Sequence, residues 1–324
     1  MMQIWMIPTH NDPLGAARQV IQTLWESADL ERMLLPLNGT SETTGPEIIA
    51  DPKLIQSFNP FTPLMPLNAA QLIPDLLSQD GRTAAVLRPC EFRTLKAMEA
   101  HGRAEIEKLI TVCVDCLGTL PVDEFDWRAQ RKGSPKGLTQ EALQFAPQGG
   151  IVPYRFRAAC QICSSPEASE ADINLGVLGL PVRQFLLIKI TNPAVAHHLQ
   201  ANEYLPLDEA LLTQHQRVTD RLVERGQSTR QRIFRGLVGL LPADIDSLVE
   251  PLQSCDDCRA CLDVCPICTS DYPQRDPEGN YIREDVLSWL VSCSGCGMCE
   301  QACPKHLPLT IIFSHIRDQL NEIL

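Results

Sequence analysis

Residues 255–266 read CDDCRACLDVCP, and residues 293–304 read CSGCGMCEQACP. Both stretches follow the pattern C-x2-C-x2-C-x3-C-P, in which three closely spaced thiolates surround one cubane 4Fe–4S cluster. The chain turns away after this tight loop, so the fourth cysteine of each copy reaches the other cluster. The spacing therefore predicts one cluster held by Cys255, Cys258, Cys261 and Cys303, and a second held by Cys293, Cys296, Cys299 and Cys265.

Structural zinc and disulfides are the two other common uses of clustered cysteines. Zinc ribbons use paired C-x2-C elements, and three cysteines at this spacing crowd a tetrahedral zinc ion. The proline after each fourth cysteine, Pro266 and Pro304, belongs to the ferredoxin pattern and is not needed for zinc. Cys268 lies outside the repeat. It is either a spare buried thiol or a neighbour of a cluster, and the first interpretation is favoured.

Length, composition and charge narrow the class of protein. The 324 residues are enough for two domains, and 44% hydrophobic with 21% charged residues is typical of a folded globular chain. The formal net charge is −12, from 40 acidic and 28 basic residues. Such a surface repels phosphate backbones, so nucleic acid is not expected as a partner.

The cellular compartment is predicted from the cysteines and from the N-terminal sequence. MMQIWMIPTHNDPLG has no basic region followed by an apolar run, as a signal peptide would have. The longest strand-like apolar run, FLLIKI at 185–190, is too short for a membrane span. We therefore expect a cytoplasmic protein without a direct membrane span, whose reduced thiols are free to bind metal.

The region before the cysteine repeats predicts an α/β domain over residues 1–248. TAAVLRP at 83–89 and LITVCVDC at 109–116 are strand-like, and the helical EFRTLKAMEA lies between them. This order indicates a βαβ unit and a largely parallel sheet, with Cys90 and Cys116 at the carboxyl ends of strands, where such sheets bind ligands. Residues 117–150 are interpreted as a surface excursion, and a helical pattern over 207–240 as interrupted at Gly226.

Residues 249–324 are predicted to form a mainly α-helical, two-cluster ferredoxin-like module. REDVLSWLV, between the two cysteine motifs, has a helical pattern. The C-terminal PLTIIFSHIRDQLNEIL places apolar residues along one side of a helix, which favours core packing over docking to a partner. The residues of this stripe are Leu309, Ile312, Ile316, Leu320 and Ile323.

Five cysteines remain in the α/β region: Cys90, Cys113, Cys116, Cys160 and Cys163. Two separated C-x2-C pairs fit structural zinc about as readily as an iron–sulfur cluster. Spacing alone leaves this choice open.

Three runs in this region, VLRPCEF, ITVCVDCLGT and ACQICSSPEASEADINLG, resemble in order the motifs of a known family. The family contains the β-subunits of coenzyme F420-reducing hydrogenases and of formate dehydrogenases. The resemblance implies an α/β flavin domain with FAD and one 4Fe–4S cluster, to which some members add a two-cluster ferredoxin module. It places the cluster ligands on Cys90, Cys116, Cys160 and Cys163, with Cys113 as a bystander.

The same resemblance places FAD beside ADINLG, through Asp172, Asn174 and Gly176. An ordinary strand and turn explains these residues equally well. The sequence contains no G-x-G-x-x-G, so a Rossmann-type FAD or NAD site is not supported. Arg88 and Glu91, on either side of Cys90, depart from the family motif and leave the electron partner open.

These observations predict an oxidoreductase subunit with three 4Fe–4S clusters and FAD. FAD would exchange hydride with a soluble carrier, coenzyme F420 or NAD(P)H, and the clusters would relay single electrons to a partner. The expected partner is a formate dehydrogenase, a hydrogenase or a heterodisulfide-reductase-like unit. A self-contained, ferredoxin-fed flavin reductase of a small organic substrate is an alternative. A zinc-stabilised binding scaffold is another.

Overall fold

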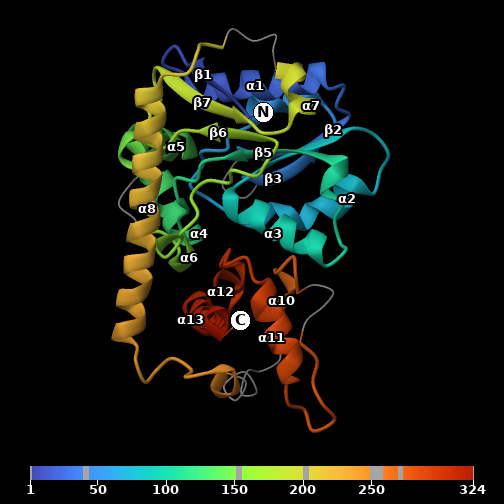
Figure 1. The fold of residues 1–324 in the computed structure, drawn as a ribbon, viewed down its shortest axis with the longest axis vertical. Helices are drawn as coiled ribbons and strands as arrows, with labels where there is room; N and C mark the ends of the chain where they lie inside the picture. Colours follow the sequence, from blue (N-terminus) through green and yellow to red (C-terminus); the bar gives the residue numbers. More distant parts are fainter. Residues whose placement is uncertain are drawn as a thin grey trace.

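A computed structural model describes residues 2–38, 44–150, 155–199, 204–248, 258–268 and 273–323 (Figure 1). A seven-stranded sheet lies at one end of the molecule, and the C-terminal helices lie at the other. Helix α3 lies on the side of the sheet that faces the C-terminal helices, and the long helix α8 runs alongside both regions.

The sheet is mixed, with a parallel centre and antiparallel edges. Its strand order is β1-β7-β6-β5-β4-β2-β3. The pairs β2·β4, β4·β5 and β5·β6 are parallel, which confirms the predicted βαβ unit, whereas β7, β1 and β3 pair antiparallel to their neighbours. The prediction of a largely parallel sheet is therefore right for the centre alone. The strands are β1 Gln3–Pro8, β2 Arg32–Leu37, β3 Gly45–Ile49, β4 Thr83–Leu87, β5 Leu109–Val114, β6 Ile173–Gly176 and β7 Phe185–Ile190.

Helices cover the sheet and build the C-terminal region. Those before residue 249 are α1 Pro13–Ser27, α2 Ile73–Leu77, α3 Pro89–Ala100, α4 Val122–Arg131, α5 Pro135–Phe145, α6 Ala158–Gln161, α7 Pro193–Ala196 and α8 Glu209–Gly236. Those after it are α10 Ala260–Asp263, α11 Arg283–Ser292, α12 Met298–Ala302 and α13 Leu309–Ile323. Short 3-10 turns occupy Pro52–Ser57, Ala69–Leu72, Ile106–Lys108, Ala146–Gln148 and His197–Leu199.

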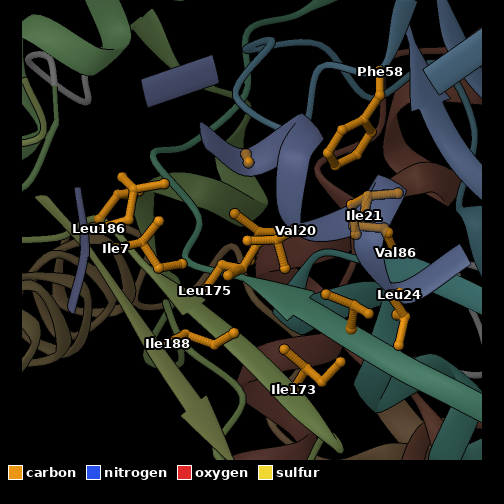
Figure 2. Packing of buried hydrophobic residues seen from close by; sticks show 14 of the residues in the cluster. Ile7, Val20, Ile21, Leu24, Phe58, Val86, Ile173, Leu175, Leu186 and Ile188 are labelled. Atoms are coloured by element: carbon orange, nitrogen blue, oxygen red, sulfur yellow. The ribbon is translucent and has the colours of Figure 1, made fainter. Parts of the chain in front are cut away.

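One face of the sheet packs against α1. This helix begins at Pro13 because the Asp12 carboxylate accepts a hydrogen bond from the Gly15 amide at 2.8 Å, which satisfies a free donor of the first turn. Its apolar side is buried against the strands (Figure 2). The labelled residues of this contact are Val20, Ile21 and Leu24 of the helix, and Val86, Ile173, Leu175 and Ile188 of the strands.

The opposite face packs against α2 and α3. Leu95 and Met98 of α3 lie in this core with Leu87 of β4. Ile267, from the C-terminal region, is buried in the same cluster. Arg103 fixes this insertion, because its guanidinium donates to the carbonyl oxygens of Pro266, at 3.2 Å, and Ile267. The two regions therefore share apolar core.

Two sequence interpretations are wrong in this part of the chain. Residues 117–150 contain helices α4 and α5, whose apolar sides are buried against each other, so they are more than a surface excursion. Gly226 lies within α8, which continues without a break to Gly236. A single glycine costs a helix about 1 kcal/mol relative to alanine, which the other 27 residues of this 28-residue helix tolerate.

The C-terminal helices enclose a separate apolar core. Trp289 of α11 and Phe313 of α13 meet edge to face, with ring centroids 4.7 Å apart. The predicted helix of REDVLSWLV is confirmed as α11. The predicted stripe is confirmed as core packing for Leu309, Ile312, Ile316 and Leu320, whereas the side chain of Ile323 lies outside the described residues. Among the described helices, none is long and apolar enough to cross a membrane.

Candidate metal centres

Four cysteines from three separate segments of the α/β region line one cavity, which we call the inner site. They are Cys90, Cys116, Cys160 and Cys163. Cys90 lies in the first turn of α3, three residues past the end of β4, and not at the strand end as predicted. Cys116 follows β5 by two residues. Cys160 lies on the short helix α6, and Cys163 lies just beyond it.

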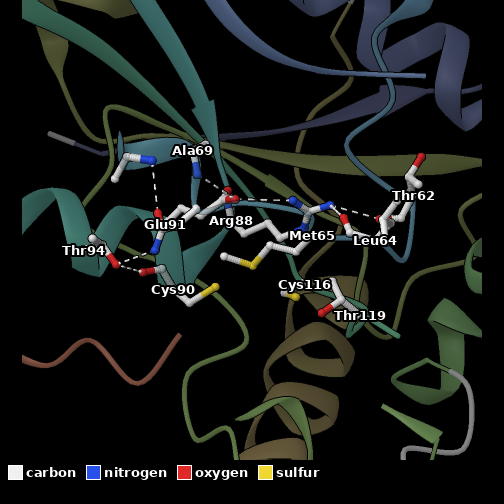
Figure 3. A network of polar contacts seen from close by, with 12 residues as sticks. Thr62, Leu64, Met65, Ala69, Arg88, Cys90, Glu91, Thr94, Cys116 and Thr119 are labelled. Atoms are coloured by element: carbon white, nitrogen blue, oxygen red, sulfur yellow. Dashed lines mark hydrogen bonds and ion pairs between the residues drawn. The ribbon is translucent and has the colours of Figure 1, made fainter. Parts of the chain in front are cut away.

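A buried polar network fixes the turn that positions Cys90 (Figure 3). Glu91 is only 2% exposed, and its carboxylate accepts hydrogen bonds from the backbone amides of Arg88, at 2.7 Å, and Ala69, at 3.3 Å. The Thr94 hydroxyl donates to the Cys90 carbonyl oxygen at 2.9 Å. These contacts cap the start of α3 and order the loop before it.

Arg88 completes this network from the other side. Its guanidinium donates to the carbonyl oxygens of Thr62 and Leu64, at 3.0 and 2.8 Å, and lies 3.5 Å from the Glu91 carboxylate. Arg88 and Glu91, which depart from the family motif, are thus a buried ion pair that supports the Cys90 turn.

The inner site is a poor environment for thiolates unless a cation binds among them, because its buried cysteines favour the neutral thiol form. Burial raises the pKa of Cys90, and nearby Glu91 and Cys116 raise it further. Burial, followed by the neighbouring Cys160, raises the pKa of Cys116 to about 12. Four thiolates so close together repel one another unless a cation lies between them. The donor set therefore fits a thiolate-bound metal group, either an iron–sulfur cluster or zinc.

Two arginines bring positive charge to these thiols. The Arg93 guanidinium donates to the carbonyl oxygen of Ser165 at 3.3 Å. Burial raises the pKa of Cys163, and the positive charge of Arg93 opposes that rise. Burial lowers the pKa of Arg157, but the sulfurs of Cys160, Cys90 and Cys296 outweigh that effect and raise it.

A second set of cysteines lines a smaller cavity in the C-terminal region, which we call the outer site. The four are Cys265, Cys293, Cys296 and Cys299. Cys265 belongs to the first motif and the other three to the second. The structure thus brings together the crossed set predicted from the spacing. Cys296 also lines the inner site, so the two cavities share a wall.

The set predicted for the remaining cluster is described in part. Cys258 is exposed, while Cys261 and Cys303 lie in the apolar core of the C-terminal helices. Cys261 is close enough to Cys299 to raise the pKa of that thiol, although burial is the larger cause. Cys255 lies outside the described residues.

The two cysteines without a predicted metal role differ in their surroundings. Cys113 is 1% exposed, on the face of β5 that packs against α3, in an apolar cluster. Cys268 is fully buried, and its hydrogen bond to the Cys265 thiol is the main reason that the pKa of Cys265 falls to about 7. This placement favours the second interpretation of Cys268, as a neighbour of a metal site.

The three residues predicted to line FAD form β6 and its entry. Asp172 accepts hydrogen bonds from the amide and hydroxyl of Thr111, both at 2.8 Å, and from the Asn192 amide group at 2.7 Å. The Asn174 amide group donates to the Ala171 carbonyl oxygen at 3.0 Å. The Asn174 side-chain oxygen is buried without a hydrogen-bond partner among the described residues.

Gly176 lies against His215, which sequence reasoning missed. A β-carbon on Gly176 would lie 3.0 Å from His215 Nε2. His215 is fully buried on α8, and its Nε2 lies 2.9 Å from an Asp115 carboxylate oxygen that also accepts the amides of Val177 and Leu178. This contact attaches α8 to the sheet beside Cys116. Isolated His and Asp residues 100 positions apart give no sequence signal for it.

A wide groove runs between α8 and the β1–β7 edge of the sheet. Its lining includes Ile4, Glu167, Lys189 and Arg221. Asn174 pairs with Lys189 in register, and cross-strand partners share a face of the sheet. Asn174 therefore lies on the same face of the sheet as Lys189, one strand inward, and outside the groove itself. The other two residues contact this chain instead: Asp172 accepts hydrogen bonds from Thr111 and Asn192, and Gly176 lies against His215.

Comparison with known proteins identifies one domain of this chain. Residues 251–307 match the 4Fe-4S dicluster domain, so the C-terminal region is an iron–sulfur domain. The match agrees with the predicted module and with the two cysteine repeats.

Two curated proteins are similar over shorter stretches. Subunit alpha 1 of the acetyl-CoA decarbonylase/synthase complex of Methanosarcina barkeri is 35% identical over 86 residues, and subunit beta of the F420-dependent formate dehydrogenase of Methanocaldococcus jannaschii is 33% identical over 82 residues. The matches cover 25% and 22% of this chain. The chain spans only 10% and 22% of the length of these relatives.

A solved structure shares the fold over a larger region. A chain of the xenon-derivatised F420-reducing [NiFe] hydrogenase complex from Methanosarcina barkeri superposes with a TM-score of 0.51. The superposition covers 71% of this chain and 90% of that one, at 13% identity. At this identity the likeness concerns the fold.

Proposed function

We propose that the protein is an electron-transfer iron–sulfur subunit of an oxidoreductase complex, with three 4Fe–4S clusters and one FAD. The observation that supports this most directly is the wall that the inner and outer sites share at Cys296. Two metal groups on either side of one cysteine are close enough to exchange electrons. A purely structural zinc site has no need of this arrangement.

The cluster in the inner site would be bound by Cys90, Cys116, Cys160 and Cys163. The cluster in the outer site would be bound by Cys265, Cys293, Cys296 and Cys299. The third cluster would be held by Cys255, Cys258, Cys261 and Cys303. When bound, such clusters accept and release one electron at a time. The protein supplies the thiolates, the apolar surroundings and the charged groups that set their potentials.

The flavin part of the proposal is supported by the family resemblance and by the groove beside β6. FAD converts hydride transfer into single-electron steps, which the clusters require. The groove is large and open, and Asn174, whose side-chain oxygen is buried and unsatisfied among the described residues, lies on the same face of the sheet as Lys189 of the groove, one strand inward. Asn174 is therefore the residue of the ADINLG run that we retain nearest FAD. Asp172 and Gly176 would shape β6.

The proposed route runs from a soluble hydride carrier to FAD, the inner site, the dicluster module and a partner subunit. The hydride carrier would be coenzyme F420 or NAD(P)H; ferredoxin, which transfers single electrons, would be the electron donor in the alternative of a self-contained reductase. The named relatives belong to formate dehydrogenase, hydrogenase and acetyl-CoA decarbonylase/synthase complexes, which supports a catalytic partner of the formate dehydrogenase, hydrogenase or heterodisulfide-reductase-like type. A cytoplasmic location agrees with reduced cysteines.

Anaerobic purification followed by iron, zinc and flavin analysis tests this function. We expect a brown protein with about twelve iron atoms per chain, from three cubane clusters, and stoichiometric FAD that one of NADH, NADPH or reduced coenzyme F420 reduces. About eight irons with stoichiometric zinc would make the inner site structural. A colourless zinc protein would overturn the whole proposal in favour of a binding scaffold.

A further inference from the structure

Arg157 occupies an unusual position for a charged side chain. It is 7% exposed and lies immediately before α6, on the lining of the inner site. Its Nε donates to the Thr119 hydroxyl at 2.9 Å. Its two terminal nitrogens lie 3.3 Å from the Met298 sulfur and 3.1 Å from the Met65 sulfur.

Among the described residues, no carboxylate contacts this guanidinium. Besides the groups above, its partners are the Gln301 side-chain oxygen at 3.4 Å and the Cys160 sulfur at 4.0 Å. In the part of the chain that the structure describes, none of these partners is a carboxylate. Arg88, the other buried arginine nearby, has Glu91. A buried ion without a counter-charge costs several kcal/mol, so the fold needs an anion next to Arg157.

We propose that the missing anion is the thiolate-bound cluster of the inner site, and that Arg157 raises the reduction potential of this cluster. The inference rests on the proposed function, because it requires a redox-active metal group there. Reduction adds one electron, and one negative charge, to a group that already bears the charge of four thiolates. A fixed positive charge in apolar surroundings stabilises the reduced form more than the oxidised form.

The contacts of Arg157 also indicate which of the two sites its positive charge stabilises more in the reduced form. Its guanidinium contacts Cys160 of the inner site. It also contacts Met298, which lies between the outer-site cysteines Cys296 and Cys299. The shortest of these sulfur contacts are to thioethers, which carry no charge. The charge of Arg157 acts most strongly on Cys160 and Cys90 of the inner site and less on Cys296 of the outer site, so an electron shared between the two sites is held preferentially at the inner one.

Arg157→Met and Arg157→Lys test this inference in the full-length, cluster-loaded protein. Methionine removes the charge and matches the two thioethers beside it, whereas lysine keeps the charge. Arg128→Met is the matched control, since Arg128 is half-buried on α4 and pairs with Glu124 at 2.7 Å. The measurement is a dithionite titration followed by electron paramagnetic resonance, with iron analysis of each variant.

We expect Arg157→Met to keep about twelve irons per chain. It should lower the equilibrium constant for one-electron reduction of the inner cluster by at least tenfold, a shift of about 59 mV to more negative potential. Arg157→Lys should restore most of the shift, and Arg128→Met should show none. Full iron with an unchanged inner potential in Arg157→Met would overturn the inference alone. Wild-type protein without iron in the inner site would overturn the proposed function instead.

Discussion

Gly226 of α8 touches the backbone of Cys163 so closely that no side chain fits between them. A β-carbon on Gly226 would lie closer than 3.0 Å to the Cys163 carbonyl group. The atoms in the way belong to backbone, which cannot swing aside as a side chain would. The long helix therefore forms one wall of the inner site, and the missing side chain of Gly226 makes that contact possible.

Gly226→Ala should thus displace the Cys163 loop and weaken metal binding at the inner site. We expect a loss of about four irons per chain and a destabilisation of about 1–3 kcal/mol from the overpacked contact. Gly236→Ala is the control, because no atom lies within 4 Å of a β-carbon there. That substitution should leave iron unchanged and stabilise α8 by up to about 1 kcal/mol. Equal iron in both variants would contradict this account of the wall.

Cys116→Ser and Cys113→Ser differ by three positions and should behave differently. Cys116 lines the inner site, whereas Cys113 is buried in the apolar core beneath α3. We expect Cys116→Ser to lower the iron content by about four atoms per chain. Cys113→Ser should keep the iron and reduce the melting temperature, since it buries a polar hydroxyl in an apolar cluster. If Cys113→Ser lost iron and Cys116→Ser kept it, Cys113 would be the ligand and Cys116 would have no metal role.

In the predicted ligand sets, the fourth cysteine of each motif binds the cluster of the other motif, so its substitution should damage that other cluster. Cys303→Ser should perturb the cluster of Cys258 and Cys261, and Cys265→Ser the cluster of Cys293, Cys296 and Cys299. Electron paramagnetic resonance of each reduced variant distinguishes the two signals. If each substitution altered only the cluster of its own motif, the crossed assignment would be wrong.

His215→Ala should loosen α8 from the sheet. The buried Asp115 carboxylate would keep its two backbone donors but lose the His215 ring, at a cost of about 2 kcal/mol or more, including the cavity. Anaerobic thermal unfolding should show a lower melting temperature. Gln216→Ala, whose exposed side chain bonds only to Asp220 one turn away, is the neighbouring control and should unfold near the wild-type temperature. An unchanged His215→Ala would show that α8 is held by other contacts.

Truncation of the C-terminal module should separate hydride exchange from electron delivery. A chain ending at Leu248 leaves Ile245 and Leu248 exposed, because both pack in the C-terminal core, so an end at Gly236 is better matched to the structure. The shorter chain keeps all four inner-site cysteines but loses Ile267 from the shared core and the wall of Gly295 and Cys296, so it should be less stable. We expect it to keep FAD and the inner cluster under anaerobic conditions, to be reduced by its carrier, and to fail with the partner. Full partner-coupled turnover would favour the self-contained reductase.

Sequence periodicity predicted the elements whose apolar residues recur regularly. The parallel centre of the sheet, α11 and the stripe of α13 follow from such patterns. The crossed set around Cys265 follows from the ferredoxin spacing and from nothing else in the chain. By contrast, α4 and α5 were missed because their sequences are polar and interrupted by Gly133 and Pro135. Their stability comes from packing against each other, which a local pattern does not show.

The inner site was predictable only through the family resemblance. Its cysteines come from three segments, and the contacts that position them are specific to the folded chain. Arg157 is such a case, since a lone arginine before a short helix has no distinctive pattern. Glu91 and Gly226 have clear roles only once Ala69 and Cys163 are seen beside them.

The wall at Cys296 also bears on how the protein matures. Gly295 and Cys296 close one side of the inner cavity, and Gly297 packs against Ala159 so tightly that a β-carbon on it would clash. If the inner cysteines bind a cluster as proposed, the docked dicluster module narrows the approach to them on this side. Iron and sulfide should then load the inner site faster before the module settles against α6 than after it has docked.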